Sequence, residues 1–156
     1  MLIEQIQALK QTTGRLLGVD FGDVRTGLAV SDTARFLASG LETIKPGSMT
    51  KTAEAVARAA REHGVVGIVV GLPVNMNGSQ GERAEHARMF AAMLDERVSD
   101  LPILLLDERM TTMAAARFLN ETNTRGQKRK QVIDTLSAQI ILQNCIDRLK
   151  YMSSEE

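Results

Sequence analysis

Short apolar runs separated by glycine-rich or charged turns predict five strands along the chain. Three of them, "RLLGVD" (15–20), "VVGIVVG" (65–71) and "PILLLDER" (102–109), are continuously apolar, as strands buried on both faces usually are. Two more, "TGLAVSD" (26–32) and "FLASGLETI" (36–44), follow the first run after short turns and predict a three-stranded antiparallel start. The first and last buried runs end in carboxylates.

Helical spacing predicts the remaining elements. Residues 50–64 are rich in alanine and stop at a glycine, and residues 75–98 combine a loop with a helix in which Ser79 and Glu82 have capping-box spacing. A shorter helix over 113–121 and a long one over 130–150 follow. Leu2, Ile6 and Leu9 are spaced as on a short amphipathic helix.

This order, β-β-β-α-β-α-β-α-α, predicts a single α/β domain over 15–150, with an N-terminal extension at 1–14 that contains the short helix and a tail at 151–156. The sheet is expected to be mixed, with three antiparallel strands followed by parallel strands joined through helices. Ligands of open α/β sheets bind outside the carboxyl ends of the parallel strands. We therefore expect Asp20, the loop at 73–78 and Glu108 to converge.

Composition and charge narrow the functional classes. The 156 residues carry 19 basic and 19 acidic side chains, so nucleic acid would have to bind to a local patch. "RGQKRK" (125–130), with Lys128, Arg129 and Lys130, is one such patch, or else a solvated loop. Membrane-length apolar runs and a convincing signal peptide are missing, and one cysteine favours a cytoplasmic location.

A third carboxylate sharpens the chemistry. Asp134 lies among apolar residues of the long last helix, where an ionised side chain is costly without a cationic partner. A divalent metal shared with Asp20 and Glu108 would satisfy all three acids, and oxygen-only ligands suit Mg²⁺ or Mn²⁺. Such a metal would activate water against a phosphodiester. Asp107 remains an alternative to Glu108, because neighbouring strand residues point to opposite faces.

Four segments, "LLGVDFGDVRTGLAVSD", "VVGLPVNMNGSQGERAEHARMFAAML", "LLLDERMTT" and "KRKQVIDTLSAQIILQ", occur in an order that resembles the pre-16S rRNA nuclease family. These RNase H-like proteins are also described as Holliday junction resolvase-like, and the resemblance covers about residues 15 to 148. It implies an RNase H-like fold and a bacterial cytoplasmic nuclease that matures the 5′ end of 16S rRNA. The family's acidic triad falls on Asp20, Glu108 and Asp134, and its basic and polar site residues fall on Arg25, Asn75 and Arg109.

Three other functions fit parts of the pattern. An actin-like ATPase uses a similar strand-turn-strand, but needs two such lobes, and this chain supplies one. A Holliday junction resolvase would use the same carboxylates on DNA, within a dimer. A non-catalytic RNA-binding factor of ribosome assembly would retain the scaffold without the chemistry.

The preferred interpretation is a metal-dependent nuclease that acts on RNA rather than DNA. It would be a monomer or a homodimer, with pre-ribosomal particles as further partners. Few aromatic residues (3%) argue against recognition by base stacking.

Overall fold

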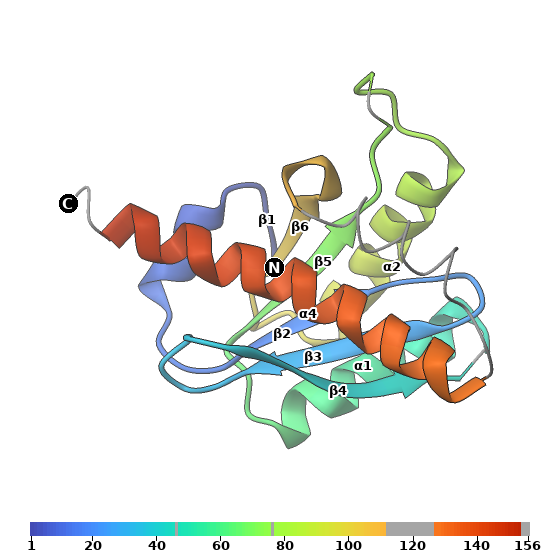
Figure 1. The fold of residues 1–156 in the computed structure, drawn as a ribbon, viewed down its shortest axis with the longest axis horizontal. Coiled ribbons are helices and arrows are strands. Elements are labelled where there is room, and N and C mark those ends of the chain that lie inside the picture. Colours follow the sequence, from blue (N-terminus) through green and yellow to red (C-terminus); the bar gives the residue numbers. More distant parts are fainter. Residues whose placement is uncertain (46, 76, 112–126, 154–156) are drawn as a thin grey trace.

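A mixed six-stranded sheet forms the centre of the molecule (Figure 1). The computed structural model describes residues 1–45, 47–75, 77–111 and 127–153, with the side chains of the last helix described from Thr135. The strand order is β1-β6-β5-β2-β3-β4. The strands are β1 (Leu2–Ile3), β2 (Leu16–Asp20), β3 (Thr26–Ser31), β4 (Ala38–Ile44), β5 (Gly67–Leu72) and β6 (Ile103–Asp107). The helices are η1 (Ile6–Gln11), α1 (Met49–Glu62), α2 (Glu82–Arg97), η2 (Glu108–Met110) and α4 (Gln127–Ser153).

The pairing confirms the expected mixed sheet. β2, β3 and β4 pair antiparallel, whereas β5 lies parallel to β2 on one side and to β6 on the other. The carboxyl ends of β2, β5 and β6 therefore meet at one edge of the sheet, which is where ligands of such sheets bind.

The N-terminal residues differ from the prediction of one short helix. Leu2 and Ile3 form β1, which pairs parallel to Ile103 and Leu104 of β6, and a 3₁₀ helix follows at Ile6–Gln11. Helical spacing at only three apolar positions cannot distinguish these structures. The open edge of β6 offers ladder hydrogen bonds that an isolated helix would not use, and the Ile103 amide donates to the Met1 carbonyl.

Helices cover both faces of the sheet (Figure 1). On one face α4 packs on Leu16, Val69, Leu104 and Leu106, together with Ala29 of β3. On the other face α1 and α2 pack on the alternate residues of the same strands, among them Leu17, Val19, Ile68, Val70 and Ile103. Buried Cys145 belongs to the α4 face, as expected of a core residue. Within the described part of the chain, the helices are too short or too polar to cross a membrane.

Two glycines let α4 approach the sheet closely. A Cβ added to Gly18 of β2 would lie 2.7 Å from the Cβ of Leu142 and 2.9 Å from the Ala138 carbonyl oxygen. A Cβ added to Gly71 of β5 would lie 2.6 Å from Cδ1 of Ile141. At Gly18 a side chain would collide with the Ala138 backbone, and at Gly71 it would displace the end of the Ile141 side chain, so α4 lies close to the backbone near the carboxyl ends of β2 and β5.

The helix starts correct one sequence signal. Ser48 caps α1, because its side chain accepts a hydrogen bond from the Lys51 amide. The capping box predicted from Ser79 and Glu82 is wrong: α2 begins after Gly81, which supplies no side-chain cap. Ser79 instead donates its amide and its hydroxyl to Oδ1 of Asn77 in the preceding loop. The predicted helix at 113–121 lies outside the described residues.

Candidate active site

Acidic residues occupy the ends of the strands on either side of β5. Asp20 is the last residue of β2, and Asp107 is the last residue of β6, with Glu108 directly after it. β5 lies between these strands and ends at Gly71-Leu72. Asp20 and Glu108 therefore lie at the same edge of the sheet, as expected.

Asp107 and Glu108 face opposite sides of the sheet. Glu108 is 8% exposed, and its carboxyl carbon lies 3.5 Å from the position of a Cβ on Gly71, which also faces Ile141 of α4. Glu108 therefore follows Leu104 and Leu106 on the α4 face. Asp107 instead accepts a hydrogen bond from Nη2 of Arg109 at 2.7 Å and from the Arg109 amide at 2.9 Å. The Arg109 guanidinium holds the pKa of Asp107 below its usual value, whereas burial opposes that shift.

Asp20 shares the α4 face with Glu108. In a strand, residues two apart lie on the same face, and Gly18, two residues before Asp20, lies directly under Leu142 and Ala138 of α4. Asp134 is in α4, four residues before Ala138, so α4 brings that helix position toward β2. The side chains of Asp134, Lys128, Arg129 and Lys130 lie outside the described residues.

Two arginines line a hollow beside Asp20. Arg25, predicted as a substrate-binding residue, and Arg83 of α2 line it together with Asp20 and the turn between β2 and β3. Arg83 was not predicted: it is neither among the site residues that the family resemblance implies nor in the basic run at 125–130. Its position beside Asp20 depends on how α2 packs. A basic residue in the first turn of a helix that follows a glycine-containing loop is only a weak sequence signal for a phosphate-binding role.

The loop before α2 holds Asn75 in a compact turn. The Asn75 amide donates to the Ser79 carbonyl at 3.0 Å, and Nδ2 of Asn75 donates to Oγ of Ser79 at the same distance. Nη1 of Arg109 lies 3.5 Å from the position of a Cβ on Gly78 in this loop. The structure therefore brings Arg109 next to the loop that holds Asn75.

The donor set is suitable for a hard divalent cation. Asp20 and Glu108 offer only carboxylate oxygens, which Mg²⁺ and Mn²⁺ prefer. No group of three possible metal ligands occurs among the residues that the structure describes, and the third predicted ligand, Asp134, has its side chain outside them. The two described acids fit a metal site that a third residue would complete.

Solved structures identify the fold as RNase H-like. The structure of RuvC from T. thermophilus in complex with a Holliday junction substrate matches 85% of this chain and 93% of its own, with a TM-score of 0.57 and 14% sequence identity. A second structure of Thermus thermophilus RuvC matches with the same TM-score over 89% of this chain and 96% of its own. At this identity the likeness shows the fold, and it confirms the predicted fold class.

Sequence relatives identify the family. The family model described as "RuvX: Holliday junction resolvase" matches residues 14–148, and the chain belongs to this family. A relative from Paracoccus denitrificans is 40% identical over the whole of both chains. A relative from Rhodopseudomonas palustris is 45% identical over 90% of this chain and 86% of its own. Both carry the name "Putative pre-16S rRNA nuclease", so the expected family and the expected class, a phosphodiester hydrolase, are confirmed.

Proposed function

We propose that this nuclease hydrolyses RNA with a divalent cation held by Asp20, Glu108 and Asp134, and that it matures the 5′ end of pre-16S rRNA in the cytoplasm. One observation carries the proposal: Asp20 and Glu108 lie on the same face of the sheet, at strand ends on either side of β5, beneath α4. The names of the relatives support the choice of substrate.

Each described residue has a distinct role in this proposal. Asp20 and Glu108, with Asp134, would hold Mg²⁺ or Mn²⁺, and the cation would supply Lewis-acid stabilisation of the charge that develops on the phosphodiester. Arg25 and Arg83, on the hollow beside Asp20, would bind the phosphates that flank the scissile one. Glu108, because it is nearly buried against Gly71, keeps a fixed position for its ligand oxygens.

The remaining predicted residues would position the strand. Arg109 is fixed by Asp107 and lies next to the Asn75 loop, so the two can bind neighbouring backbone groups. Lys128, Arg129 and Lys130 at the start of α4 would add sequence-independent attraction to phosphates. Pre-ribosomal particles would be the natural source of the substrate, and the enzyme would act as a monomer or a homodimer.

The description of the family model favours a second candidate, a four-way DNA junction. The same carboxylates and cation would cleave it. A symmetric junction requires two sites at matched strands, and therefore a dimer with twofold symmetry. The two candidates thus differ in oligomeric state and in substrate, but not in the chemistry of the site.

Cleavage by the purified protein tests both candidates. Wild type, Asp20→Asn and the control Asp147→Asn, at an exposed position of α4, receive labelled 16S rRNA precursor, generic single-stranded RNA or a four-way junction. Mn²⁺ or Mg²⁺ is added, or EDTA in their place. We expect cation-dependent RNA cleavage by wild type and Asp147→Asn, and a rate at least about 100-fold lower for Asp20→Asn, since residues that merely orient metal ligands often account for ~10–100-fold.

Three results would contradict parts of the proposal. Preferential cleavage of the junction would support the resolvase instead. Cleavage that persists in EDTA or in Asp20→Asn would exclude the carboxylate site. If no substrate is cut by wild type, the non-catalytic assembly factor becomes the better explanation, and binding to pre-ribosomal particles becomes the activity to measure.

A further inference from the structure

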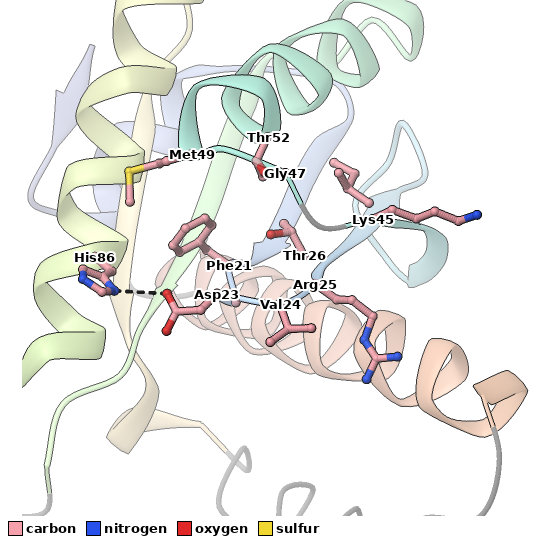
Figure 2. A pocket seen from close by; sticks show the side chains of 12 residues that line it. Phe21, Asp23, Val24, Arg25, Thr26, Lys45, Gly47, Met49, Thr52 and His86 are labelled. Carbon is pink, nitrogen blue, oxygen red and sulfur yellow. Dashed lines mark hydrogen bonds and ion pairs between the residues drawn. The ribbon is translucent and has the colours of Figure 1, made fainter.

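A small pocket lies on the far side of the turn that follows Asp20 (Figure 2). The turn between β2 and β3 forms one wall, the start of α1 with the end of β4 forms a second, and His86 of α2 lies at its border. It opens on the face that α1 and α2 cover, and none of the predicted acids lines it. Arg25 is the only predicted site residue among its lining residues.

Two threonine hydroxyls reach the pocket from opposite walls (Figure 2). Thr26 comes from β3 and is 2% exposed, and Thr52 comes from α1 and is 7% exposed. Neither hydroxyl oxygen is a buried atom left without a partner, so a ligand that replaces water in the pocket can form hydrogen bonds with both of them.

The rest of the wall is apolar and includes an aromatic ring. Phe21 lines the pocket and packs one ring face against buried Phe90, with ring centroids 4.5 Å apart and ring planes 12° apart. Met49 and Ile44 extend the apolar lining. A flat, partly polar ring system fits this combination, because an aromatic wall and a few directed hydrogen-bonding groups are what nucleobase sites present.

The rim is basic and connects the pocket to the hollow beside Asp20. Lys45 and Arg25 both line the pocket, and their charged ends point outward from it (Figure 2). Arg25 also lines the hollow that contains Asp20 and Arg83, and so do the other residues of the turn from Phe21 to Val24. One phosphate bound by Arg25 could therefore join a nucleotide in the pocket to the strand at Asp20. At the other side of the turn, Asp23 is tied to His86, with 3.1 Å between Oδ1 and Nδ1.

We infer that this pocket binds a single nucleobase of the substrate strand, turned out beside the phosphate at Asp20. Thr26 and Thr52 would hydrogen-bond to the edge of the base, Phe21 would pack on it, and Arg25 would bind its phosphate. The inference rests on the proposed function for the identity of the strand. Base contact here would give the enzyme a preference at one position near the cleavage site, beyond what phosphate contacts supply.

Binding of mononucleotides to the full chain tests the inference without cleavage. Each nucleoside 5′-monophosphate of A, G, C and U is titrated in EDTA at up to millimolar concentration, with ribose 5-phosphate as the ligand that lacks a base. Amide chemical shifts locate the site. We expect at least one nucleotide to bind at least about tenfold more tightly than ribose 5-phosphate and to shift the resonances of Thr26 and Thr52.

Variants of Thr52 distinguish the loss of its hydroxyl group from a loss of folding. Thr52→Val should weaken binding of the preferred nucleotide about three- to tenfold, which is the usual contribution of one hydrogen bond. Thr52→Ser should restore the binding, and Thr50→Val, at an exposed position of the same helix, should leave it unchanged. Thermal unfolding of each variant verifies that it is folded.

Several results would overturn the inference. Equal binding of ribose 5-phosphate would define a site for an anion only. Shifts confined to the surroundings of Asp20 and Arg83, equal binding by Thr52→Val and wild type, or no binding at all would exclude a base in the pocket. Because no cation or cleavage is involved, an inactive nuclease that binds nucleotides would count against the proposed function and still support the pocket.

Discussion

The two faces of the sheet use the same strand end for different purposes. On the α4 face, the end of β2 carries Asp20, and a close helix covers it because Gly18 has no side chain. On the opposite face, the next residue, Phe21, stacks on Phe90 and lines a pocket with Thr26 and Thr52. Strand alternation thus lets one turn serve a carboxylate site on one side and a hydroxyl-lined pocket on the other.

Strand β6 repeats the contrast with two carboxylates. Glu108 lies on the α4 face and is 8% exposed, whereas Asp107 lies on the other face and is paired with Arg109. If the α4 face holds the cation, these adjacent acids should differ strongly in their effect on cleavage. Substituting each acid in turn therefore tests which face of the sheet holds the cation.

The largest effect is expected for Glu108→Gln. The substitution keeps the size of the side chain and removes the negative charge, so the rate of RNA cleavage with Mn²⁺ should fall at least about 100-fold. Asp107→Asn should lower the cleavage rate far less, because Asp107 acts only through the position of Arg109. Single-turnover cleavage by the three proteins, each verified as folded by circular dichroism, measures the contrast.

Equal losses for the two variants would contradict the assignment of the faces. A larger loss for Asp107→Asn would place the cation on the face of α1 and α2. Glu108→Asp serves as the matched variant, since it retains the charge but shortens the reach, and its rate should lie between those of wild type and Glu108→Gln.

The next effect, on stability, comes from the contact between α4 and β2. In Gly18→Ala the new methyl group would lie 2.7 Å from Cβ of Leu142 and 2.9 Å from the Ala138 carbonyl oxygen, so α4 must move. Overpacking of this kind should lower the free energy of unfolding by about 1–3 kcal/mol, as urea denaturation would measure. Cleavage should weaken as well, because α4 carries Asp134, whereas nucleotide binding to the opposite pocket should persist.

Gly47→Ala is the matched control for that variant. A Cβ on Gly47 meets Lys51 at 3.7 Å, an ordinary contact, so this substitution should not destabilise the protein. If Gly18→Ala unfolds at the same urea concentration as wild type, the close approach of α4 does not constrain the site in the way we describe.

Much of the fold could be predicted because its strands are buried on both faces. The apolar runs before Asp20 and Asp107 became β2 and β6, and the alanine-rich segment became α1, with Ser48 as its cap. The N-terminus could not be predicted in this way. Leu2 and Ile3 form a strand only because β6 offers a free edge, and no local pattern encodes a partner one hundred residues away.

The candidate site was predictable only in part. Carboxylates at strand ends are visible in the sequence, so Asp20 and the pair at 107–108 were found, but the choice between Asp107 and Glu108 needs the register of the strand. The position of Arg83 and the pocket between Thr26 and Thr52 depend on how three elements pack together, which local sequence patterns do not predict. Low aromatic content also obscured Phe21, since one well-placed ring can serve a base without any aromatic cluster.

The smallest effect concerns Asp107 and pH. Arg109 lowers the pKa of Asp107 in the folded protein. A carboxyl whose pKa is lowered by folding stabilises the protein at pH values above the pKa that it has in the unfolded chain, about 3.9. That contribution is lost as the pH falls through the lower value of the folded state. Asp107→Asn should therefore unfold at a slightly lower urea concentration than wild type at pH 7, and at nearly the same concentration once Asp107 is protonated.

The size of that difference is limited by exposure. The side chains of Arg109 and Asp107 are 35% and 28% exposed, and ion pairs at such positions are screened by water and salt. A difference that persists below the pKa of the folded carboxyl would mean that Asp107 stabilises η2 through its hydrogen bond from the Arg109 amide rather than through charge. In that case the pair would act on the position of Arg109 beside the Asn75 loop at every pH, and its role would be geometric, like that of Gly18 on the opposite face.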